Sequence, residues 1–285
     1  MTDRLVRFDG DRFARSFGRE AFPVEHELEG HPLLSQGRLA QLARTLPDDC
    51  MEWNAGDVGL VHDPASERPN GLCAAETVER IDACGSWIVL KRIERDPEYA
   101  GLLARCLSDL DAGLAPLGER RFRTRGFIFL SSPGAVTPLH LDPELNFLLQ
   151  VRGSKAITVY DRGDRGVVRE ADLERFAAGG HRNVAFDLES QEAPVAWRLA
   201  PGDGVHVPLH APHVVQNGDD VSISLSVTFQ TQTSDAERAV LLVNHRLRQL
   251  GLSPRAYGGA GWSERVKHAL VRSVRGARGL LRAGR

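Results

Sequence analysis

The middle of the chain alternates between short apolar runs and turn residues, a pattern typical of antiparallel β-strands. The runs at 126–131, 136–141, 146–151 and 156–160 are rich in β-branched and aromatic residues, and Ser-Ser-Pro-Gly, Asp-Pro-Glu and Arg-Gly-Ser separate them. Side chains two residues apart in a strand face the same way. The pattern therefore predicts a mainly β core with one set of side chains pointing into a cavity between strands.

Helical spacing appears on both sides of this β core. Apolar residues recur at helical intervals in 36–46 and 98–110, and a buried strand is predicted between them within 85–93. The polar connection from 160 to 195, with a short helix predicted near 170–178, is a lid, a substrate contact or a plain surface excursion. We expect three parts: an α/β N-terminal region at 1–119, a β core at 120–233 and C-terminal helices at 234–285.

Candidate metal ligands lie in the predicted core. His140 and Asp142 are two residues apart in one predicted strand, so both side chains point into the cavity. The segment 201–215 adds three histidines: His206 in a strand, His210 in a turn and His213 at the start of the next strand. Two histidines and one carboxylate with open positions form the facial triad that holds Fe(II) in non-haem oxygenases. We expect His206 to be either a cavity contact or a core histidine, and His210 to be exposed.

The spacing of these residues resembles one family. The run Val-Thr-Pro-Leu-His-Leu-Asp-(x3)-Asn-Phe-(x3)-Val-Arg-Gly-Ser-Lys at 136–155, followed by Pro-Gly-Asp-(x4)-Pro-(x4)-His at 201–213, is similar to the cupin-like JmjC 2-oxoglutarate oxygenases. That group includes the asparaginyl hydroxylase acting on hypoxia-inducible factor. The resemblance covers roughly residues 120–230 and implies a double-stranded β-helix, two antiparallel sheets in a jelly roll.

The resemblance also implies a role for individual residues. His140, Asp142 and His213 would ligate Fe(II), which makes His213 the expected third ligand. Lys155 and Thr137 would bind the distal carboxylate of 2-oxoglutarate. Lys155 also fits this role on physical grounds, because a dicarboxylate deep in a pocket needs a cation, and leaving it unpaired would cost several kcal/mol.

Two further positions concern the inner carboxylate of 2-oxoglutarate. Asn146 stands where the family places an amide near the carboxylate that chelates the metal. Ser226, in the run VSISLSVTF, replaces a second Asn of the asparaginyl hydroxylase. Part of the expected hydrogen bonding to 2-oxoglutarate therefore differs in this chain.

The predicted activity is hydroxylation of an amino-acid, peptide or natural-product C–H bond, with Fe(II) as metal, 2-oxoglutarate as cosubstrate and O2 as oxidant. Demethylation would use the same residues. Asp142 argues against a halogenase, which usually lacks this carboxylate so that chloride can bind. Two alternatives remain: a cupin-type metal protein without 2-oxoglutarate chemistry, in which Lys155 has no role, and a non-catalytic binding or regulatory module.

Composition adds little beyond a globular enzyme. The 285 residues are 42% hydrophobic, and their net charge of −2 does not favour binding of the whole chain to nucleic acid. No apolar run approaches the ~20 residues of a membrane span, and the N-terminus has no apolar signal core. The four cysteines have no Cys-x-x-Cys spacing, so we expect free thiols and a cytoplasmic location.

The C-terminal part is predicted to be helical. Ser234 is expected as the N-cap, with Glu237 completing a capping box. After Glu264 the chain is basic with no acidic residue, while apolar residues recur at helical spacing; the basic residues are Arg265, Lys267, Arg272, Arg275, Arg278, Arg282 and Arg285. Such a helix either pairs two protomers or docks on a membrane surface or an acidic partner. Because related hydroxylases pair through C-terminal helices, we expect a homodimer.

Overall fold

The computed structural model describes residues 4–56, 69–182, 194–258 and 261–283, with only the backbone described for 272 and 274–283. Its strands are β1 (Val6–Arg7), β2 (Phe22–His26), β3 (Met51–Ala55), β4 (Ser86–Lys91), β5 (Phe122–Ser131), β6 (Val136–His140), β7 (Leu145–Arg152), β8 (Lys155–Val159), β9 (Val195–Leu199), β10 (Asp203–Val207), β11 (His213–Asn217) and β12 (Ser222–Gln230). The four strands predicted from the apolar runs are β5 to β8.

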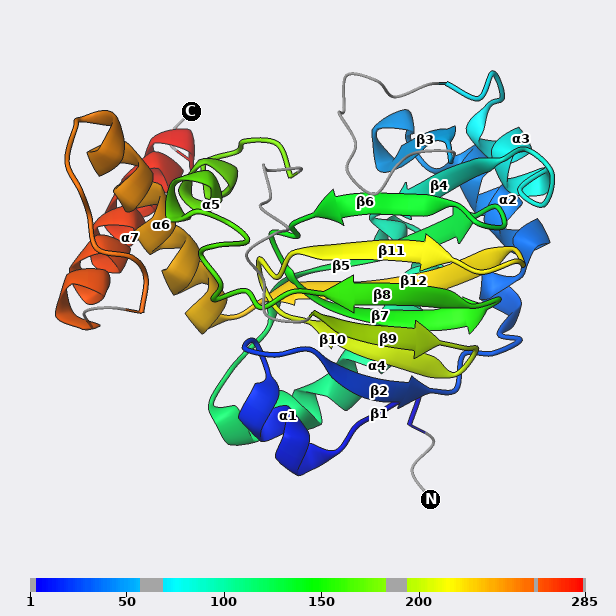
Figure 1. Cartoon of the computed structure of the whole chain (residues 1–285), viewed down its shortest axis with the longest axis horizontal. Coiled ribbons are helices and arrows are strands. Elements are labelled where there is room, and N and C mark those ends of the chain that lie inside the picture. The colour runs from blue at the N-terminus through cyan, green and yellow to red at the C-terminus, as the bar shows by residue number, and fades with distance from the viewer. Residues whose placement is uncertain (1–3, 57–68, 183–193, 259–260, 284–285) are drawn as a thin grey trace.

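These strands form two antiparallel sheets in the described part of the chain (Figure 1). The larger has eight strands in the order β1-β2-β10-β7-β12-β5-β4-β3, and the smaller has four in the order β6-β11-β8-β9. The first 119 residues supply strands at both ends of the larger sheet, with β1 and β2 at one end and β3 and β4 at the other. The N-terminal region is thus hydrogen-bonded to the core, and the mainly β architecture with flanking helices agrees with the predicted pattern.

Strand β12 shows how the two faces of the larger sheet differ. Its apolar residues Leu225 and Val227 belong to the core beneath the helices. Ser226, between them in sequence, points to the opposite face because successive side chains alternate. That face meets the smaller sheet, since Leu148 of β7, the register partner of Ser226, packs with Ile157 of β8. The polar side chain of Ser226 on β12 therefore points into the space between the two sheets.

Helices flank the sheets (Figure 1). They are α1 (Gly10–Ser16), α2 (Gln36–Thr45), α3 (Ala74–Glu79), α4 (Pro97–Leu114), α5 (Glu170–Ala177), α6 (Gln232–Gln249) and α7 (Gly261–Ala283). Phe13 of α1, Leu39 of α2 and Leu103 of α4 share one apolar cluster with Phe147 and Leu149 of β7. Helices α5, α6 and α7 lie together at another side of the molecule (Figure 1). None of the helices in the described ranges combines the length and apolar character that a membrane span requires.

A tight turn leads from β7 in the larger sheet to β8 in the smaller sheet. Gly153 in this turn has φ +67°, a left-handed conformation that favours glycine. A Cβ atom here would also lie 2.4 Å from the Val221 carbonyl oxygen, so the turn passes closer to the backbone at Val221 than another residue would allow. Lys155, two residues after this glycine, occupies the first position of β8.

Helix α6 begins earlier than its sequence predicts. Thr231 is the N-cap, and its hydroxyl accepts a hydrogen bond from the Ser234 N–H while Ser234 completes the capping box. The expected box of Ser234 with Glu237 was therefore wrong. Glu237 instead points into the protein, where its side chain is buried. A capping motif is local, and here the long-range partners of Glu237 decide its orientation.

Candidate metal site and its cavity

Three side chains meet between the sheets. His140 ends β6 and His213 begins β11, and the two are register partners across antiparallel strands. Asp142 follows His140 by two residues. His140 Nε2 lies 3.8 Å from Asp142 Oδ1, and His213 Nε2 lies 3.6 Å from Asp142 Oδ2. One ligand atom from each residue lies within 4.8 Å of the others, so this group can hold a metal ion.

The two rings are oriented by backbone carbonyls. His140 Nδ1–H donates to the Pro138 oxygen at 2.7 Å, and His213 Nδ1–H donates to the Ala211 oxygen at 2.9 Å. Each Nε2 is thereby left with its lone pair facing Asp142, the tautomer that a metal ligand requires. Both rings are buried, and Asp142 is partly so.

The electrostatics of the site also suit a cation. Burial lowers the pKa of His140, and the neighbouring His213 lowers it further, so the ring is neutral near pH 7. Burial opposes ionisation of Asp142, but the pKa of this carboxyl stays below its usual range because of His213, His140 and Arg182. Two atoms that each lie about 2.1 Å from one ion can be up to about 4 Å apart, which these separations satisfy. Neutral imidazoles and an ionised carboxylate are the forms that bind divalent metals.

Lys155 lines the same cavity. It is the register partner of Asn217 on β11, the strand that begins with His213. The lysine is 5% exposed, and among the described residues its ammonium group has neither an ion pair nor a hydrogen bond. Burial lowers its pKa to about 7. Thr137 of β6 lines the cavity too, so the structure brings both predicted carboxylate contacts to the cavity of the metal-binding group.

Asn146 and Ser226 form a chain of hydrogen bonds to the metal-binding group. Asn146 Nδ2 donates to Asp142 Oδ2 at 3.3 Å, and Ser226 Oγ donates to Asn146 Oδ1 at 2.5 Å. Asn146 lines the cavity, while Ser226 lies behind it on β12. The serine thus fixes which end of the Asn146 amide faces Asp142, and acts on the cavity through that amide.

The two rival histidines lie outside the metal-binding group. His206 is fully buried, with its ring against Phe147 at a centroid distance of 4.6 Å. Its Nδ1–H donates to the Asn146 oxygen, and its Nε2 accepts from the Gly18 N–H. Burial lowers the pKa of His206 to about 3, so it is a neutral core residue. His210 is also buried, at 4% exposure, and the expectation of an exposed turn histidine was wrong.

The mouth of the cavity carries charged residues that the sequence did not reveal. Glu52 of β3 and Arg182 line it, and their charged atoms are 4.0 Å apart. Glu52 also pairs with Lys91 of β4. The Arg182 carbonyl accepts from the Leu141 N–H at 3.1 Å, which attaches this rim to the metal-ligand segment. Neither acid nor arginine belongs to a recognisable motif, so no sequence signal could have found them. The lid proposed within 160–195 falls partly outside the described residues.

Comparison with known proteins supports the fold. The sequence matches no family model. An X-ray structure of Escherichia coli YcfD matches with a TM-score of 0.54 at 16% identity, covering 93% of this chain and 67% of that one. Two further YcfD structures, of a protein described as a ribosomal oxygenase, contain cobalt with 2-oxoglutarate or with succinic acid. Their TM-scores are 0.48, at 16% and 17% identity, covering 93% and 91% of this chain and 66% and 65% of those chains. The likeness shows a shared fold of antiparallel sheets with helices.

Proposed function

We propose that this chain is an Fe(II)- and 2-oxoglutarate-dependent oxygenase that hydroxylates a C–H bond of an amino acid, peptide or natural product. One observation carries the proposal: the group His140, Asp142 and His213 shares its cavity with Lys155, a buried lysine with no ion-pair partner among the described residues. A bound metal ion would explain why the three ligating side chains lie together, but it would not explain the buried lysine. An anionic ligand that reaches into the cavity accounts for the lysine as well.

The architecture supports the same proposal. We infer that the two sheets form a double-stranded β-helix of the jelly-roll kind, with residues 120–233 as its catalytic core. YcfD, whose fold this chain shares, is described as a ribosomal oxygenase, and one of its structures is in complex with cobalt and 2-oxoglutarate. The narrower resemblance to the asparaginyl hydroxylase stays a prediction.

When bound, Fe(II) supplies the redox chemistry by which O2 and 2-oxoglutarate become succinate and CO2 while R–H becomes R–OH. The residues of the chain bind and orient. As ligands, His140 and His213 would each add an uncharged imidazole and Asp142 one negative charge. The site with Fe(II) would then have a net charge of +1, which attracts a dianion. Lys155 would pair with the distal carboxylate, and Thr137 would donate a second hydrogen bond. Asn146 holds Asp142 Oδ2, which fixes the carboxylate orientation.

Apolar side chains strengthen this recognition. Leu148, Ile157 and Val215 line the cavity beside Lys155. They keep water away from the expected lysine–carboxylate pair, and an ion pair is stronger where the surroundings are less polarisable. A dicarboxylate of defined length would therefore be preferred over a monocarboxylate.

The test is spectroscopic and chemical. Anaerobic protein with Fe(II) and 2-oxoglutarate should show the weak visible charge-transfer band of a chelated 2-oxo acid, and admission of air should yield succinate. His140→Ala removes one ligand, so both the band and succinate above background should disappear. Wild-type protein that binds Fe(II) but gives neither signal would contradict the proposal and favour a cupin-type metal protein or a non-catalytic module.

We also propose that two copies pair through the C-terminal helices. Lys267 Nζ of α7 donates to Asn244 Oδ1 of α6 at 2.6 Å, so the polar side of α7 faces its neighbour. Trp262, Val266 and Leu270 are exposed, with Trp262 at 76%. Each of them lies four positions along the chain from the next, so they form one apolar stripe along α7. The basic side chains at 272 and beyond lie outside the side chains that the structure describes.

Sedimentation at micromolar concentration tests this pairing. The wild type should be a dimer, and Trp262→Ala with Val266→Ser should shift it toward monomer because the apolar stripe is lost. Arg265→Ser, on the same helix but outside the stripe, is the control. A monomeric wild type would exclude the dimer.

A further inference from the structure

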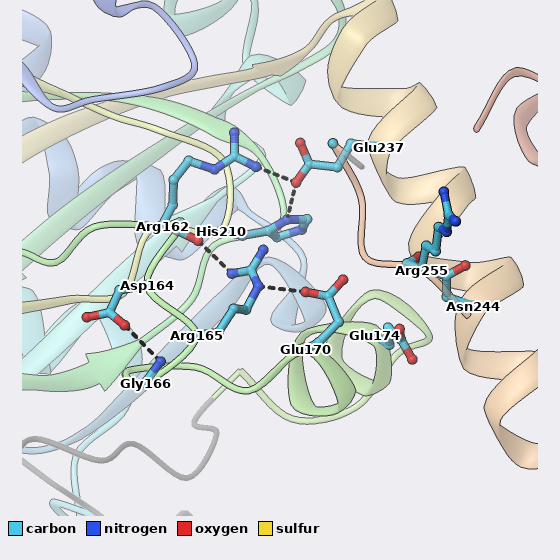
Figure 2. Close-up of polar contacts among 12 residues, drawn as sticks. Arg162, Asp164, Arg165, Gly166, Glu170, Glu174, His210, Glu237, Asn244 and Arg255 are labelled. Atoms are coloured by element: carbon cyan, nitrogen blue, oxygen red, sulfur yellow. Dashed lines mark hydrogen bonds and ion pairs between the residues drawn. The ribbon is translucent and has the colours of Figure 1, made fainter. Parts of the chain in front are cut away.

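A second buried cluster of charges lies at the junction between the sheets and helices α5 and α6 (Figure 2). Glu237 of α6 is 3% exposed, and its Oε1 accepts from His210 Nδ1–H at 3.2 Å. The same oxygen pairs with the guanidinium of Arg162, which also donates to the Gly18 carbonyl at 2.6 Å. Burial opposes ionisation of Glu237, but the hydrogen bond from His210 and the charge of Arg162 hold its pKa below the usual range. The Glu237 carboxylate is therefore ionised and has partners within the protein.

His210 occupies a turn that contacts Asp142 and His213, two residues of the metal-binding group. Its φ is +60°, a left-handed conformation that is strained for a residue other than glycine. Its backbone N–H donates to the Asp142 carbonyl oxygen at 3.2 Å. The next residue, Ala211, provides the carbonyl that orients the His213 ring. Residues 210 and 211 thus make backbone hydrogen bonds to two of the three proposed ligands.

The side chain of His210 is held from two elements. Glu237 of α6 accepts its Nδ1–H, and Phe176 of α5 packs edge-on against its ring at a centroid distance of 5.8 Å. The strained backbone persists only where the surroundings determine it. Glu237 is the charged one of these two supports, and Arg162 keeps it in place.

We propose that Glu237 is a positioning residue for the metal site: through His210 it holds the 210–211 turn in the conformation that sets the Asp142 backbone and the His213 ring. The proposal rests on the metal site of the proposed function. The carboxylate belongs neither to the metal-binding group nor to the cavity lining, and it acts by restricting a turn whose two hydrogen bonds reach the ligands. Helix α6, from outside the β core, therefore takes part in the geometry of the cavity.

Cobalt(II) is the probe, because its visible absorption reports ligand geometry and its titration gives an affinity without turnover. Glu237→Ala should weaken Co(II) binding about 10- to 100-fold, as is typical when a residue supporting metal ligands is lost. His210→Gly should weaken it comparably, since glycine accepts the φ of +60° but removes the ring that contacts Glu237. Glu237→Gln should stay within about threefold of wild type, because its amide oxygen can still accept from His210.

The matched control is Glu174→Ala. Glu174 of α5 is fully buried and accepts from Arg248 of α6 at 2.8 and 3.0 Å, so its removal disturbs the same helices through a different ion pair (Figure 2 shows Glu174). We expect its Co(II) affinity within about twofold of wild type at a comparable loss in urea stability. An equal loss of Co(II) affinity in this control would reduce the Glu237 effect to general destabilisation and overturn the proposal.

Wild-type Co(II) affinity and spectrum in His210→Gly would overturn it as well, even if Glu237→Ala does not fold. The proposed oxygenase activity stands or falls separately. If the wild type forms no succinate but Co(II) binding still depends on Glu237 and His210, the activity is wrong and the positioning role holds.

Discussion

Lys155 and Glu237 are both buried ionisable side chains, but they differ in whether charged partners lie nearby. Lys155 lies between the sheets with no ion-pair partner among the described residues, and burial lowers its pKa to about 7. Glu237 lies at the junction with the C-terminal helices and has two partners, His210 and Arg162. These partners outweigh burial, so the pKa of Glu237 falls below the usual range. The charge satisfied within the protein supports the architecture, whereas the unsatisfied one indicates a ligand.

The contrast follows from the free energy of desolvation. Removing a charge from water costs several kcal/mol, and the folded state recovers this only when partners lie nearby. Glu237 has its partners in every folded molecule. Lys155 would obtain one only when an anionic cosubstrate enters, so its desolvation penalty in the free protein becomes part of the selectivity for that anion.

The first and largest effect should be opposite changes in stability at the two positions. Glu237→Ala leaves Arg162 and His210 without their carboxylate partner, and the free energy of unfolding should fall by about 3–5 kcal/mol. Lys155→Met removes an unpaired buried charge with little change of volume, so the free energy of unfolding should rise at pH 6 without 2-oxoglutarate. Urea unfolding measures both, with the exposed Glu29→Ala expected within about 0.5 kcal/mol of wild type. A Lys155→Met protein that is less stable than wild type would erase the contrast.

The second effect concerns the cosubstrate. Lys155→Ala removes a charge-assisted hydrogen bond of roughly 1.5–3 kcal/mol. The affinity for 2-oxoglutarate should fall on the order of 10- to 150-fold, with Fe(II) affinity little changed because Lys155 is not a ligand. Calorimetric titration measures both, and Lys267→Ala on α7 is the control. Equal 2-oxoglutarate affinity in mutant and wild type would remove Lys155 from the site.

The third effect is a pH dependence of stability. Between the folded pKa of about 7 and the ordinary lysine value of 10.5, the unfolded chain holds a proton on Lys155 that the folded chain has lost. Unfolding then takes up a proton, so the free energy of unfolding should rise with pH through this window. The rise attributable to Lys155 is the difference between wild type and Lys155→Met in urea unfolding from pH 6 to 10. Saturating 2-oxoglutarate should reduce it, because the dianion favours the protonated lysine.

Parts of the site were predictable because strands have a period of two. Their spacing predicted that His140 and Asp142 point the same way, and the structure brings them together although β6 ends at His140 and Asp142 lies just beyond it. The apolar runs also predict the strand that carries Lys155. The resemblance selected His213 among three histidines, and the structure places His213, His140 and Asp142 together. Their roles as ligands, and those of Thr137 and Asn146 toward 2-oxoglutarate, stay proposals that the experiments above test.

Other parts depend on which distant segments meet. A histidine between prolines in a turn is expected at the surface, but His210 is buried because α5 and α6 cover it. Glu237 fits a capping box by its spacing, yet its partners lie 27 and 75 residues away. Glu52 reaches the cavity mouth only because β3 pairs at the edge of the larger sheet.

The amino-acid sequence by itself determined the strand pattern and the residue types that can bind a metal ion and an anion, because these follow from local patterning and side-chain chemistry. The tertiary structure decided that Lys155 has no partner among the described residues and that Glu237 has two. Pairing of buried charges is a property of three-dimensional proximity, and its free energy depends on solvent exclusion that arises only when the sheets and helices pack.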